Sequence, residues 1–177
     1  EVLVKLLDGE LTAMITAHKA NDIITALRIQ KEFGFPMVLD GAAEAYLVLD
    51  EIKEAGVPVF IHPPMIRLGG DAKNASLETP ARLQDAGIPF AFQSGFEGYV
   101  PKTRVVRYEA AIAAAFGLGM EHALSHSTIE AAKILGIDNR VGSLKRGKDA
   151  DLALFDGDPF EYTTHVTGVI VNGEKVK

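Results

Sequence analysis

Short apolar runs alternate with longer helical patterns over the first 135 residues of the chain. The runs span residues 11–17, 36–39, 57–61 and 88–92. Helical spacing of apolar residues follows them, over residues 21–33, 42–55, 77–86, 104–116 and 121–135. Runs of this length with apolar residues at successive positions indicate strands that are buried on both faces. The repeated order of strand and helix predicts an α/β fold, in which helices cover a parallel sheet.

The C-terminal segment has a different pattern. Residues 152–155 and 169–171 are short apolar runs, and Asn172-Gly173 follows the second of them. Asn-Gly is a strong signal for the tight turn of a β-hairpin, because both residues accept a positive φ. We therefore expect antiparallel strands after residue 140.

Two architectures fit the strand and helix units: a doubly wound open sheet, and part of an eight-stranded barrel. A Gly-x-Gly-x-x-Gly motif after the first strand would favour the open sheet, and the sequence does not contain it. Four strands cannot close a barrel, so the first and last strands would have open edges. We expect these edges to pair with a second copy of the chain or with a missing N-terminal half.

The composition and net charge of the chain restrict the classes of partner that it can bind. The 177 residues are 47% hydrophobic, and the formal net charge is −6 without a long basic run. This balance argues against nucleic acid or an anionic membrane as a partner and leaves a small-molecule substrate. The absence of cysteine excludes disulfides and thiolate ligands. No apolar stretch approaches the roughly 20 residues of a membrane span, and no signal-peptide pattern is present, so we expect a cytoplasmic protein.

The run from Gly142 to Leu152, which contains Asp149-Ala150-Asp151, resembles a signature near the C-terminus of amidohydrolase-superfamily proteins. The resemblance continues through Asp156-Gly157-Asp158-Pro159 and through residues 169–176, and it is imidazolonepropionase-like. It implies that residues 1–140 are the C-terminal half of a TIM barrel, about the last four βα units, since a complete (β/α)8 barrel has about 250 residues. Residues 141–177 would supply C-terminal strands of a small composite β-sandwich.

The resemblance also implies a site at the C-terminal ends of the strands. There the family holds one or two divalent ions, most often zinc, which activate a water molecule. His18 matches the ligand of the fifth barrel strand, and Asp40 stands where the family has a histidine ligand. Gly95 stands in the position of the catalytic aspartate, so the catalytic residue is unknown, with Glu97 as a candidate two residues later. The His-x-His pair of the family is absent from the sequence.

Other polar residues near the expected strand ends are candidates for substrate binding. His62 follows the third strand and could contact substrate or replace a metal ligand. Tyr99 lies in the loop after the fourth strand, and Arg104 follows that loop. His122 and His126 are four residues apart on an expected helix, and we interpret them as structural. His165 is expected on the surface.

Two functions remain open from the sequence. The first is hydrolysis of non-peptide carbon–nitrogen bonds, in a cyclic amide or imidazolone-type substrate, at an atypical metal site. The second is a metal-free, non-hydrolytic relative that acts as a binding or structural protein, which Asp40 and Gly95 favour.

Overall fold

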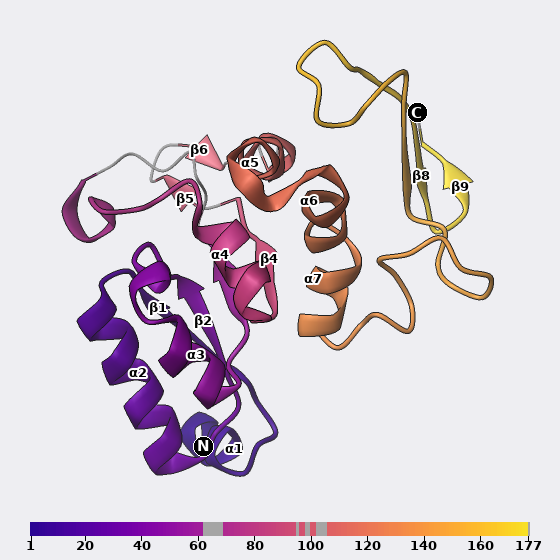
Figure 1. Cartoon of the computed structure of the whole chain (residues 1–177). Helices are drawn as coiled ribbons and strands as arrows, with labels where there is room; N and C mark the ends of the chain where they lie inside the picture. Colours follow the sequence, from indigo (N-terminus) through magenta and orange to yellow (C-terminus); the bar gives the residue numbers. More distant parts are fainter. Residues whose placement is uncertain (62–68, 95, 98–99, 102–105, 177) are drawn as a thin grey trace.

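The computed structural model describes residues 1–61, 69–94, 96–97, 100–101 and 106–176. Its centre is a parallel sheet of β1 (Ala13–Ala17), β2 (Met37–Gly41), β3 (Val59–Ile61) and β4 (Phe90–Phe92), in that order (Figure 1). The parallel α/β fold expected from the sequence is confirmed. Among the described residues β1 pairs only with β2 and β4 only with β3, so both outer strands have an open edge.

Three helices connect the strands: α2 (Ala20–Phe33), α3 (Leu49–Ala55) and α4 (Thr79–Ala86). Their apolar residues Ile23, Ile52 and Leu83 have no exposed surface and form one core with Leu39 and Phe90 of the sheet. Burial of such a side chain stabilises the fold by about 1.5–3 kcal/mol. Because the four strands are parallel, their C-terminal ends lie together along one end of the sheet.

The first strand departs from the expected pattern. Strand β2 is buried throughout, but the β1 residue Met14 is 65% exposed. Helix α1 (Val2–Leu7), which the apolar spacing did not indicate, contains no buried residue. Burial on both faces is therefore confirmed for β2 and wrong for β1, because β1 lies at an open edge of the sheet.

Further elements follow the sheet. They are a two-stranded ladder of β5 (Phe96–Glu97) and β6 (Val100–Pro101), helix α5 (Val106–Ala113), a π-helical turn at Ala114–Leu118, helix α6 (Met120–His126) and helix α7 (Ile129–Ile134). Short 3₁₀ turns lie at Ala45–Leu47 and Gly70–Ala72.

Two expected helices are wrong in extent. Residues 42–48 form a loop with a 3₁₀ turn, so α3 begins only at Leu49. The expected helix 121–135 is broken between α6 and α7, where Ser127 and Thr128 donate their hydroxyl groups to the carbonyl oxygens four residues earlier, both at 2.8 Å. Such side-chain bonds compete with the helical backbone pattern and bend or end helices.

The C-terminal strands form a separate antiparallel sheet of β7 (Leu152–Phe155), β8 (Val166–Val171) and β9 (Glu174–Lys175). In Figure 1 this sheet lies beyond α6 and α7, on the side away from the parallel sheet. Asn172 and Gly173 have φ values of 52° and 82° and join β8 to β9, which confirms the expected hairpin. No helix in the described part of the chain has the length and apolar character needed to cross a membrane.

Candidate functional site

Two of the expected metal ligands lie at the C-terminal ends of neighbouring strands of the parallel sheet. His18 follows β1 directly, and Asp40 is the fourth residue of β2. The register pairs Ala17 with Gly41, so the two positions lie on neighbouring strands. The His18 ring packs against the backbone of Gly41, where an added Cβ atom would lie 2.7 Å from His18 Cε1. The close approach therefore requires glycine at position 41.

The Asp40 carboxylate accepts hydrogen bonds from side chains of β1 and of the residue that follows β4. The Asp40 side chain is buried, and Thr16 Oγ1 of β1 donates a hydrogen bond of 2.6 Å to Oδ2. Gln93 Nε2, from the residue after β4, donates to Oδ1 at 2.5 Å. Since β3 lies between β2 and β4, the Gln93 side chain reaches across one strand. Asp40 thus connects polar groups from three strand ends.

A second carboxylate fixes the loop that carries His18. The buried Glu44 accepts hydrogen bonds from the backbone N–H of Ala20 at 2.8 Å and from the Asn74 side chain at 2.5 Å. These two bonds, the first more than the second, hold the pKa of Glu44 below its ordinary value. The Glu44 backbone N–H donates to the carbonyl oxygen of His18 at 2.8 Å. Glu44 therefore ties the loops after β1 and β2 to residue 74.

An exposed ion pair joins the same loops. Lys19 Nζ lies 2.5 Å from Asp71 Oδ1, and this contact raises the pKa of Lys19 and lowers that of Asp71. Pairs at exposed positions add little stability because solvent screens them. The sequence interpretation missed Glu44, Lys19 and Asp71 as positioning groups. The position of Glu44, four residues after Asp40 at a strand end, was the available signal.

The described residues do not complete a metal site. No group of three or more His, Cys, Asp or Glu side chains comes together among them. His18 and Asp40 are suitable donors for zinc, but catalytic zinc sites have three protein ligands. The described residues therefore offer at most two of these three ligands, and the metal-binding roles of His18 and Asp40 stay predictions.

Several expected site residues lie outside the described ranges. His62, Gly95, Tyr99 and Arg104 are in the gaps, and the Glu97 side chain is not described although its backbone belongs to β5. Their roles stay predictions.

The remaining histidines are away from this edge. His126 is buried and stacks on the Phe90 ring. Its two ring nitrogens lie within hydrogen-bond distance of the Phe90 carbonyl oxygen and of Gln84 Oε1, which confirms its structural role. His122 is exposed on α6, which does not support the structural role expected for it. The His165 side chain is 80% exposed, as expected.

Comparison with known proteins identifies the lineage. The amidohydrolase family model matches residues 100–176. The crystal structure of an amidohydrolase from Thermotoga maritima MSB8 has a TM-score of 0.92 and 34% identity, over 98% of this chain and 45% of that chain. An adenosine deaminase from Xanthomonas campestris with bound zinc shares the fold, with a TM-score of 0.69 and 19% identity over 98% of this chain and 46% of that chain.

Two curated proteins are similar in sequence. Amidohydrolase tasK from Hapsidospora irregularis is 28% identical over 167 residues, which are 90% of this chain and 16% of that protein. Imidazolonepropionase from Shewanella frigidimarina (strain NCIMB 400) is 58% identical over 41 residues, 23% of this chain and 10% of that protein. The chain thus spans less than half the length of each of these relatives. The signature at residues 142–152, the parallel sheet and these similarities together establish that the chain belongs to the amidohydrolase superfamily.

Proposed function

We propose that the chain contributes part of the active site of a hydrolase that cleaves carbon–nitrogen bonds other than peptide bonds, with a cyclic amide or imidazolone-type substrate. The observation that carries the proposal is the position of His18 and Asp40 at the C-terminal ends of neighbouring strands, where barrel enzymes bind substrate. The local similarity to an imidazolonepropionase supports this substrate class. The superfamily includes a deaminase with bound zinc among the structural relatives, which supports a divalent metal, most often zinc.

The site is proposed to be composite, because two donors cannot by themselves form a catalytic zinc centre. His62 follows β3 in the sequence and is the candidate for a third ligand from this chain. The other ligands would come from an N-terminal half of the barrel. We propose residues 1–140 as the barrel portion of this assembly and residues 141–177 as its share of a β-sandwich.

The surface of α1 and β1 supports such a partner. Val2, Leu3 and Val4 on α1 are 58–72% exposed, and Met14 lies on the open strand β1. A strand with free backbone groups next to exposed apolar side chains is suited to pairing with another strand. A preceding βα unit of the same barrel would cover both features. A second copy of the chain remains the alternative occupant of this edge.

A metal-free binding protein is the second candidate function. The observation that favours it is the Asp40 carboxylate, whose two oxygens both accept hydrogen bonds from uncharged side chains. These bonds give Asp40 a structural role without a metal. Each oxygen still has a second lone pair, so the bonds leave metal coordination open.

Zinc titration separates the two functions when it is made on the longest polypeptide that contains this chain, because the proposed site takes further ligands from an N-terminal half. We expect one zinc ion per chain by calorimetry, and His18→Ala should weaken binding by at least about 100-fold, because loss of an outer-shell partner alone costs about 10–100-fold. His122→Ala, which removes an exposed histidine of α6, should leave the affinity unchanged. Absence of zinc binding, or equal affinity of the wild type and His18→Ala, would reject the hydrolase proposal in favour of the metal-free protein.

A further inference from the structure

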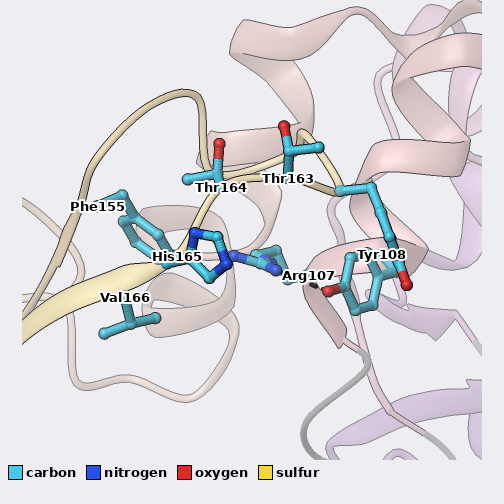
Figure 2. A pocket seen from close by; sticks show the side chains of 8 residues that line it. Arg107, Tyr108, Phe155, Thr163, Thr164, His165 and Val166 are labelled. Atoms are coloured by element: carbon cyan, nitrogen blue, oxygen red, sulfur yellow. Dashed lines mark hydrogen bonds between the residues drawn. The ribbon is translucent and has the colours of Figure 1, made fainter.

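A cleft lies between helix α5 and the C-terminal strands. It shares no residue with the candidate site around His18 and Asp40. Its volume is about 740 Å³. Its walls are Arg107 and Tyr108 of α5, Phe155 at the end of β7, and residues 162–166 that lead into β8 (Figure 2). A cleft of this size falls in the range of small-molecule sites, about 300–1,000 Å³.

Aromatic rings fix the guanidinium of Arg107 within this cleft. Its Cζ atom lies 4.8 Å from the centre of the Tyr108 ring and 5.6 Å from that of Phe155. Arg107 Nη2 also donates a hydrogen bond of 2.8 Å to the Tyr108 hydroxyl. These contacts restrict the side chain before any ligand arrives, so less conformational entropy is lost on binding.

Most of the donors on Arg107 are not used by the described part of the protein. A guanidinium has five N–H donors, and one of them is paired here. No carboxylate of the described residues lies within 4.0 Å of it. Arg82 provides an internal contrast, since its Cζ lies 5.6 Å from the centre of the Tyr46 ring but its Nη2 pairs with Glu78 at 2.8 Å. Arg107 has the same kind of ring contact, and none of the described carboxylates pairs with it.

The other groups of the cleft suit a flat anion. His165, Thr163 and Thr164 line the same cleft as Arg107 and lie on the connection that leads into β8 (Figure 2). The acidic group nearby, Asp156, is engaged by His165, with Oδ2 3.4 Å from Nδ1 and Oδ1 accepting the His165 backbone N–H at 2.8 Å. The Tyr108 and Tyr162 rings are tilted, with centres 6.4 Å apart, and Tyr162 is 85% exposed.

We propose that this cleft binds a small molecule in which a carboxylate or phosphate is attached to a flat ring. The guanidinium of Arg107 would donate two parallel N–H bonds to the oxyanion, a geometry for which arginine is suited. The rings of Tyr108 and Tyr162 would contact the ring of the ligand. The formal net charge of the chain is −6, which does not favour anions in general. The attraction for an anionic ligand would therefore come from Arg107 within the cleft.

Benzoate tests the proposal as a minimal ligand, with its neutral analogue benzamide as the matched probe. In a titration followed by NMR, benzoate should bind saturably and shift the Arg107 Nε–H signal and the amide signals of residues 163–166. Arg107→Met keeps the apolar stem and removes the charge, so it should weaken benzoate binding by about 10- to 100-fold. Benzamide should bind at least about 10-fold more weakly than benzoate, since it lacks the charge. Arg82→Met is the control that should leave benzoate binding unchanged.

Two further measurements keep the test decisive. Tyr162→Ala removes an exposed ring and should weaken benzoate by about threefold to tenfold with little effect on folding, even if Arg107→Met fails to fold. Inorganic phosphate should displace benzoate, because both oxyanions would use the same guanidinium. The proposal is overturned if benzoate does not saturate, if Arg107→Met and Tyr162→Ala bind it as the wild type does, if benzamide binds equally, or if phosphate and benzoate bind independently.

Discussion

Replacement of His126 by alanine is expected to lower the free energy of unfolding by about 3–5 kcal/mol. The ring is 5% exposed and stacks on the Phe90 ring with centres 3.7 Å apart. Its Nδ1 lies 2.8 Å from the Phe90 carbonyl oxygen, and its Nε2 lies 2.7 Å from Gln84 Oε1. The alanine variant would leave a cavity and two polar groups without their partner. Urea unfolding of the two proteins measures the difference.

The pH dependence of stability gives the same residue a second readout. Burial lowers the pKa of His126 below its ordinary value of 6.5, so the folded protein favours the neutral ring. A turned Gln84 amide, which presents its NH₂ group to Nε2, would suit the neutral ring. The stabilisation should be complete above pH 6.5 and should decline as the pH falls through the lowered pKa. His126→Ala should lose this dependence.

Exposed His122 on the same helix supplies the control for His126. Its replacement by alanine should change the free energy of unfolding by less than about 0.5 kcal/mol. A loss of less than about 1 kcal/mol in His126→Ala would mean that the ring does not hold α6 against β4.

Gly41→Ala should destabilise the protein by about 2–4 kcal/mol and displace the His18 ring. Gly41 has a φ of 87°, which strains any residue with a Cβ atom, and the new Cβ would lie 2.7 Å from His18 Cε1. Both effects act at the edge that carries Asp40. Thermal unfolding measures the stability, and the NMR signals of the His18 ring report the displacement.

Gly34→Ala separates the cost of backbone strain at a positive φ from the effect of displacing the His18 ring. Gly34 has a φ of 71°, but an added Cβ would meet no atom within 4 Å. This variant should lose only the strain energy, about 1–2 kcal/mol, and leave the His18 signals in place. Equal losses in the two variants, with an undisturbed His18 ring, would contradict the close packing of His18 on Gly41.

The sequence was sufficient for the order and type of most elements. Strand and helix periodicities act over a few residues, so the four parallel strands and the Asn172-Gly173 hairpin could be predicted from local pattern. The break between α6 and α7 was missed because the apolar spacing continues through Ser127 and Thr128, and only the side-chain bonds to the preceding turn end the helix.

Fewer features of the candidate site than of the fold could be predicted from the sequence. The position of His18 and Asp40 at strand ends followed from the strand pattern and the family signature, and the structure brings both to one edge. The bond from Gln93 to Asp40 joins residues 53 positions apart, and that from Asn74 to Glu44 joins residues 30 apart. Such pairs depend on how the loops fold over the sheet, which no local pattern records. The same holds for Arg107, whose neighbour Phe155 comes from the C-terminal sheet.

The location of zinc in zinc-loaded crystals of the longest polypeptide that contains this chain tests the central claim most directly. Anomalous scattering at the zinc edge should give a peak bonded to a ring nitrogen of His18 and to a carboxylate oxygen of Asp40, at about 2.0–2.2 Å from each. That result would identify the C-terminal edge of the parallel sheet as the metal site that the hydrolase proposal requires. A peak only at His122 or His165, or no peak, would contradict it and leave Asp40 as a structural link between strands.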